Sequence, residues 1–128
     1  MTSAETTDEE VEDVYGDVGE WVEDWFAKAV AMKQLGDGRG KIFCAKWWAH
    51  KPVVVRLHSI WREWERANRE DTMSSWWSYH ADAAMRVLFD GESGPMWLCT
   101  PDKHRDVPSP QLTPVPPGWF SAGSGTTP

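Results

Sequence analysis

The chain has 128 residues, the size of a single domain, and it carries 20 Asp and Glu against 13 Lys and Arg, a net charge of −7. Ten tryptophans are far more than a chain of this length usually carries, and their bulk can supply a core that needs no disulfide. No apolar run approaches the ~18 residues of a membrane span, and no charged-then-apolar leader opens the chain. We therefore expect a cytoplasmic protein without membrane contact.

The charge is divided unevenly along the chain. Residues 1–24 carry ten acidic side chains and no lysine or arginine, whereas the remainder holds 13 Lys and Arg against the other 10 Asp and Glu. The first residues have almost nothing to bury, so we expect residues 1–16 to be a disordered acidic arm. Overall acidity disfavours non-specific binding to duplex DNA, but an acidic arm beside a mildly basic body can act as a built-in competitor.

The first predicted helix covers residues 17–35. Asp17 and Glu20 have the three-residue spacing of a capping box, and an apolar stripe recurs at helical spacing from Val18 to Met32. The glycines of the GDGRG stretch, residues 36–40, end this helix. This stretch lacks the Lys-Ser/Thr ending of a phosphate-binding loop, so it predicts a plain turn.

The central predicted helix covers residues 51–70. Pro52 suits its first turn, and apolar residues recur at helical spacing from Val53 to Ala67. Three consecutive valines at 53–55 favour a strand locally, but the periodicity outweighs them. Glu65 and Arg69 are spaced to form a surface i,i+4 ion pair.

The third predicted helix covers residues 73–89, where Thr72 can cap an apolar stripe that ends at Leu88. One more apolar segment returns to the core and ends at Cys99. Beyond it the chain is rich in Pro, Gly and Ser, so we expect residues 101–128 to be a disordered tail. Its PSPQLTPVPP stretch resembles in composition the ligands of proline-binding modules, although a plain tail is the simpler interpretation. The sequence thus predicts an all-α, three-helix domain at residues 17–100.

Most of the tryptophans lie on the apolar stripes, which favours a Trp-rich core. We expect only Trp48, Trp77 or Trp119 to be exposed. The alternative is nucleic-acid binding, in which aromatic faces stack on bases and guanidinium groups hold phosphates. The candidate contacts are four arginines of the central helix: Arg56, Arg62, Arg66 and Arg69.

Two cysteines and two histidines form the ligand set of a tetrahedral structural zinc site: Cys44, His50, His80 and Cys99. A three-helix core would bring these residues together, with His104 as a reserve ligand and His58 on the surface. The alternative is that the histidines are core and capping residues and the cysteines are small buried hydrophobes. A Cys44–Cys99 disulfide is a further alternative.

The order of landmarks along the chain is specific. A WVEDW helix, Trp21 to Trp25, is followed by Cys44 with His50, by an LxxxWxxWE stretch at 57–65, and by Gly94-Pro95 with Cys99. Over about residues 18–100 this order resembles domain of unknown function family 4913. The resemblance implies an origin in actinobacteria, their plasmids or their phages. That family has no established activity, so the resemblance implies no catalytic residue.

No serine or cysteine lies in a recognisable nucleophile motif, and Glu63 and Glu65 point to different faces of the central helix. We therefore expect a non-catalytic, protein-binding module of a phage or mobile element, which docks on a host or element-encoded protein. The alternative function is a nucleic-acid-binding accessory protein whose acidic arm masks the arginines, with zinc as the one candidate cofactor.

Overall fold

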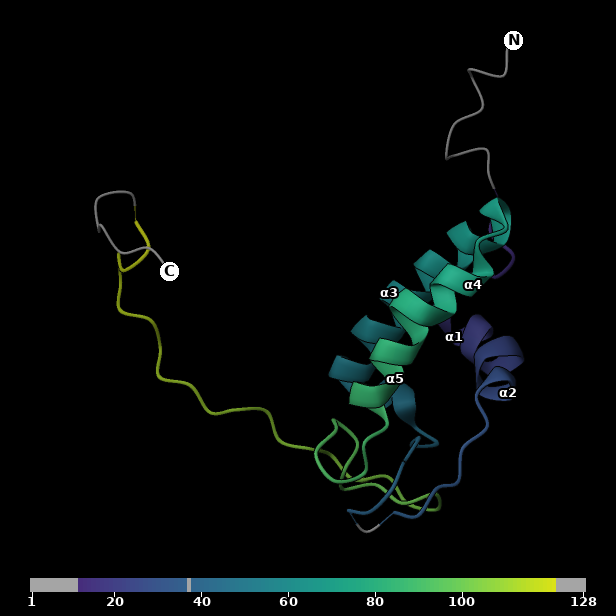
Figure 1. Cartoon of the computed structure of the whole chain (residues 1–128). Helices are drawn as coiled ribbons and strands as arrows, with labels where there is room; N and C mark the ends of the chain where they lie inside the picture. The colour runs from purple at the N-terminus through teal and green to yellow at the C-terminus, as the bar shows by residue number, and fades with distance from the viewer. Residues whose placement is uncertain (1–11, 37, 122–128) are drawn as a thin grey trace.

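The computed structural model describes residues 12–36 and 38–121 and is helical (Figure 1). Within these residues there is no β-strand, and extended pairing is limited to isolated bridges such as Gln34 with Lys41. Three helical segments pack around an aromatic cluster. The predicted all-α class with a Trp-rich core is confirmed. None of the described helices combines the length and apolar character that crossing a membrane requires.

The first helical segment runs through α1 (Val18–Trp21), a π-helical stretch (Val22–Phe26) and α2 (Ala27–Ala29). Asp17 caps it as predicted, because its carboxylate accepts a 2.8 Å hydrogen bond from the Glu20 backbone N–H. The segment ends at Ala29 rather than at residue 35, so the predicted end is wrong. Val30 is extended, with φ −112° and ψ 95°, and the chain leaves the helix there.

The second and third segments form an antiparallel hairpin. The central helix α3 covers Lys51–Glu70, as predicted, and ends where Asp71 adopts a left-handed conformation with φ 59°. After a turn of two residues the third segment runs through α4 (Met73–Trp76), a π-helical stretch (Trp77–Ala81) and α5 (Asp82–Leu88). It lies along α3 (Figure 1), which confirms the predicted helix to within one residue.

Tryptophans of all three segments meet in the core. Trp21 is fully buried, with ring centroids 6.1 Å from both Trp64 and Trp76. The indole N–H of Trp76 donates a 2.8 Å hydrogen bond to the Ile60 carbonyl, so this ring carries no unpaired donor. Outside the core, Trp48 and Trp119 are exposed as predicted, Trp77 is half-buried, and Trp97 is also exposed.

The described part of the acidic arm lies against α3. The backbone N–H groups of Val14 and Tyr15 donate to the buried Glu65 carboxylate at 2.8 and 3.0 Å, and the Tyr15 ring packs on Trp64. Glu65 also accepts from the Trp61 indole at 3.0 Å. The expected surface pair of Glu65 with Arg69 is therefore wrong, because Glu65 is buried among these three donors. Residues 1–11 of the predicted arm lie outside the described residues.

Loops gather at the N-terminal end of α3, and we call residues 38–50 and 90–106 the loop end (Figure 1). Buried Ile42 and Met96 give it a small apolar interior. Residues 107–116 then run away from the body without regular structure, and residues 117–121 form turns (Figure 1). The remaining residues of the predicted tail, 122–128, lie outside the described residues.

Candidate metal centre

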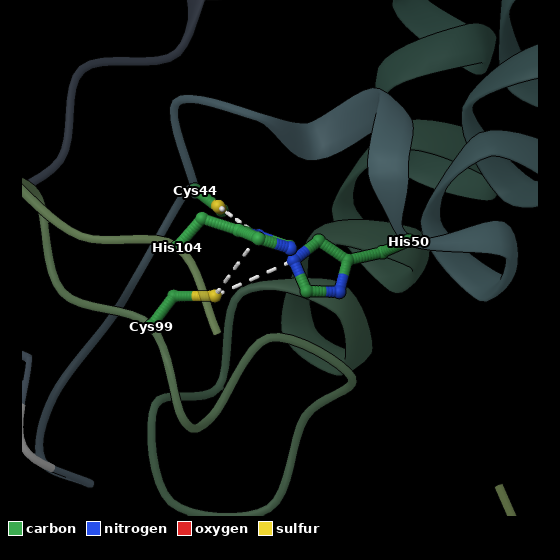
Figure 2. Close-up of side chains that lie close together, drawn as sticks. All are labelled: Cys44, His50, Cys99 and His104. Carbon is green, nitrogen blue, oxygen red and sulfur yellow. Dashed lines mark hydrogen bonds between the residues drawn. The ribbon is translucent and has the colours of Figure 1, made fainter. Parts of the chain in front are cut away.

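Four potential metal ligands converge in the loop end: Cys44, His50, Cys99 and His104 (Figure 2). Each offers one sulfur or nitrogen atom, and all four atoms lie within 4.8 Å of one another. The two cysteines and His50 are buried, and His104 is half-buried. Both cysteines are free thiols rather than a disulfide. This cluster can hold a metal ion.

The spacing of the ligand atoms suits a tetrahedral ion. Cys44 Sγ lies 3.3 Å from His104 Nδ1, and Cys99 Sγ lies 3.3 Å from His50 Nε2 and 3.9 Å from His104 Nδ1 (Figure 2). Bond lengths of about 2.3 Å to sulfur and about 2.0 Å to nitrogen separate tetrahedral ligand atoms by about 3.3–3.8 Å. The side chains therefore need only small shifts to surround an ion.

A short turn presents the first pair of ligands. Cys44 precedes a single 3₁₀ turn, Trp47–Ala49, and His50 follows it as the N-cap residue of α3. His50 makes no side-chain capping bond to the helix, so its ring is free to face Cys99. The Lys46 backbone N–H donates to Cys44 Sγ at 3.3 Å, an interaction that stabilises a thiolate.

A second turn presents the other pair. Cys99 and His104 flank a tight turn in which the Thr100 and Lys103 backbones exchange hydrogen bonds of 2.9 and 3.2 Å. Pro101 occupies the second position of this turn, where its fixed φ is favourable. The chain therefore reverses and returns His104 to the side of Cys99.

Burial shifts the pKa values of Cys44 and His50 in the protein without a metal. It raises the pKa of the Cys44 thiol to about 11, with the neighbouring Cys99 adding to the shift and the Lys46 N–H opposing it. Burial also lowers the pKa of His50, and the neighbouring His104 lowers it further. His50 is thus favoured as neutral imidazole, which is the form that binds metals, whereas an incoming ion must displace a proton from the thiol.

An outer carboxylate orients His104. Its Nε2 lies 2.9 Å from Asp106 Oδ1, while Nδ1 faces the two sulfurs. A carboxylate on the far nitrogen of a ligating histidine fixes the tautomer and the ring orientation, and it increases the basicity of the ligand. Asp106 therefore fits the role of an outer-shell partner.

A family model described as Domain of unknown function (DUF4913) matches residues 15–117, which is most of the chain. The chain belongs to the DUF4913 family. The match confirms the predicted resemblance and names no activity. It extends past residue 100, so all four cluster residues lie within the DUF4913 region. Searches of curated proteins and of solved structures gave no match.

Three of the four predicted zinc ligands lie in the cluster, and His80 does not. His80 lies on the π-helical stretch of the third segment, where its Nε2 is 3.9 Å from Glu63 Oε1. Glu63 is thirteen residues along α3 from His50, roughly 20 Å at 1.5 Å per residue. His104, the predicted reserve ligand, lies in the cluster instead. His58 is exposed, as expected.

The sequence of this DUF4913 chain contains a local turn signal that could have identified His104 as a ligand. The ligands form two local pairs, Cys44 with His50 and Cys99 with His104, and each pair flanks a turn. Pro101-Asp102 is a strong turn signal, and a turn at this point brings the residues on either side of it together. His80, in contrast, lies on a helix with no cysteine nearby in sequence.

The four arginines predicted to contact nucleic acid have different partners in the structure. Asp13 forms ion pairs with Arg62 and Arg69, the latter at 3.1 Å. Arg66 lies 3.9 Å from Glu63, and Arg56 donates a 3.3 Å hydrogen bond to the Pro52 carbonyl. Only Arg62 and Arg69 are thus held together, and a carboxylate of the acidic arm holds them.

Proposed function

We propose that this DUF4913 domain is a zinc-stabilised, non-catalytic binding module. The proposal rests on the cluster of two cysteines and two histidines, whose ligand atoms lie within 4.8 Å of one another. Two thiolates and two imidazoles in a tetrahedral arrangement are a ligand set that favours zinc. Catalytic zinc sites keep one position open for water, whereas this cluster supplies four protein ligands. A structural role therefore fits it better than a catalytic one.

A zinc ion in this position would join segments that are far apart in the sequence. It would link the start of α3, through His50, to the turn that carries Cys99 and His104. The loop end contains little regular structure, so such a cross-link would add to the order that its backbone hydrogen bonds supply.

As a binding module, the domain would dock on another protein. Large apolar side chains that remain exposed on the body, among them Trp48 and Tyr79, are suitable contacts for such an interface. We further propose that the module acts in the cytoplasm as a product of a phage or mobile element, and that its partner is encoded by the host or by the element.

Metal analysis of the protein purified without chelator tests the zinc proposal. We expect about one equivalent of zinc, and we expect Cys44→Ser and Cys99→Ser each to abolish its binding because each removes a thiolate. His80→Ala is the matched control, since it removes an imidazole outside the cluster. Zinc that binds equally well to both cysteine variants would exclude this site.

A second candidate function is that of a nucleic-acid accessory protein. It is favoured by the position of Asp13, whose carboxylate contacts Arg62 and Arg69 as a phosphate group would. The acidic arm would then mask these arginines from a nucleic acid. The single-stranded alternative through base stacking has less support, because Trp61 beside Arg62 is buried.

Titration with an oligonucleotide at two salt concentrations tests this second function. Asp13→Asn should tighten binding at low salt, and the affinity should fall steeply as salt rises. Glu92→Gln makes the same charge change at an exposed position away from the arginines. Equal affinity of the two variants and the unaltered chain would exclude masking.

A further inference from the structure

A second candidate site lies between residues 29–35 and the third helical segment. It is an open hollow of about 670 Å³. Its floor is apolar and is formed by Met32, Leu35, Trp77, Met85 and Phe89. The volume falls within the range of about 300–1,000 Å³ that is typical of small-molecule sites. The hollow shares no residue with the metal cluster.

The early end of the first helical segment creates this hollow. Because Val30 is extended, the chain departs from α2 and does not cover Trp77, which stays half-buried. Two backbone hydrogen bonds then connect the walls: Leu35 N–H donates to the Lys41 carbonyl at 3.2 Å, and Ile42 N–H donates to the Phe89 carbonyl at 2.9 Å. The walls are thus joined to one another in the protein without a ligand.

Positive charge predominates around the apolar floor. Lys33, Lys41 and Arg86 line the hollow, with Asp82 as its one acidic residue. Among the described residues, none of the three cations has a carboxylate within 4.0 Å, and Asp82 forms no ion pair with Arg86 four residues later. Lys41 lies near the Asp90 carboxyl, whose pKa is lowered by hydrogen bonds and, to a smaller extent, by the charge of Lys41. An anionic group that entered here would also gain contact with Lys33 and Arg86, for which the described residues offer no ion-pair partner.

From this combination we propose that the hollow binds a small amphipathic anion, an aromatic or medium-chain alkyl carboxylate. Its apolar body would pack on Trp77, Met85 and Phe89, and its carboxylate would lie among the three cations. A neutral ligand of the same shape would gain the apolar contacts only, and a cationic one would be repelled.

Three probes of one shape and different charge test this inference on the full chain by isothermal titration calorimetry: 1-naphthoate, 1-naphthylmethanol and 1-naphthylmethylammonium. We expect saturable binding of one naphthoate, with the neutral and cationic probes at least tenfold weaker. Equal binding of all three probes, or no saturable binding of naphthoate at millimolar concentration, would overturn the proposal.

Variants then locate the binding site. Lys33→Glu combined with Arg86→Glu should weaken naphthoate binding at least tenfold. Ala31→Trp places a large side chain at an exposed wall position and should prevent binding of every probe. Arg56→Glu makes a charge reversal on α3 outside the hollow and should leave naphthoate binding unchanged. Retained naphthoate affinity in both hollow variants, with their helical circular dichroism intact, would refute this location. None of these variants changes a metal ligand, so neither the loss nor the retention of naphthoate binding tests the zinc proposal.

Discussion

The helical segments pack through a large aromatic cluster, whereas the loop end has little regular structure and a smaller apolar interior. Trp21, Trp64 and Trp76 bring all three helical segments into one aromatic cluster. In the loop end, Gly91 N–H donates to the Gly40 carbonyl across the chain, whereas the bond of Cys99 N–H to the Met96 carbonyl joins residues close in sequence. From this difference we propose that the helical segments depend mainly on apolar contacts. The turn that carries Cys99 and His104 would gain order from a zinc cross-link to Cys44 and His50.

The largest effect is expected from a change in the aromatic core. Trp76→Ala removes a buried ring and its hydrogen bond to the Ile60 carbonyl, so it should lower the free energy of unfolding by about 3–5 kcal/mol. Urea denaturation followed by circular dichroism measures this loss. Trp48→Ala is the matched control at an exposed position and should cost little. Equal losses in the two variants would contradict the core assignment.

The second prediction separates the two candidate histidine ligands. His104→Ala should weaken zinc binding at least 100-fold, about 2.7 kcal/mol, because it removes one of four ligands. His80→Ala should leave the zinc affinity unchanged, because His80 lies near Glu63 rather than near the cysteines. Competition with a chromophoric chelator measures both affinities. The reverse result would place the fourth ligand on the third helical segment.

The third prediction concerns the outer carboxylate. Asp106→Asn should weaken zinc binding about tenfold, because an amide holds the far nitrogen of His104 less firmly than a carboxylate does. Asp102→Asn is the control, because it changes a carboxylate in the neighbouring turn that makes no hydrogen bond to His50 or His104. If both variants bind zinc as tightly as the unaltered chain, Asp106 has no orienting role.

The smallest effect is expected at the acidic arm. Asp13→Asn breaks exposed ion pairs with Arg62 and Arg69, so it should change the free energy of unfolding by no more than about 1 kcal/mol. The same change should become smaller at high salt. A loss of several kcal/mol would show that the arm belongs to the core rather than to the surface.

Much of the helical fold could be predicted from the sequence, because its signals are local. Apolar residues from Val53 to Ala67 repeat at helical spacing, and α3 has the predicted bounds. The first helix was predicted too long because Met32 continues the apolar stripe. That stripe assumes 3.6 residues per turn, whereas Val22–Phe26 is π-helical, and the bridge between Gln34 and Lys41 holds the following chain extended.

The candidate site was predictable only in part. Residue chemistry alone selected both cysteines and His50. The choice between His80 and His104 depends on which chain segment reaches the end of α3, and helical periodicity carries no such information. The burial of Glu65 could not be foreseen either, since its partners Val14 and Tyr15 lie about fifty residues away in a stretch with few apolar residues.

Hydrogen exchange of the zinc-loaded and chelated protein, with the zinc content measured on the same sample, tests the central claim most directly. We predict about one equivalent of zinc. On chelation the amides of Ile42 and Cys99 in the loop end should lose protection, while those of Ile60 and Trp64 in α3 should retain most of theirs. A zinc-free preparation with identical loop-end exchange and melting temperature with and without added zinc would contradict the account.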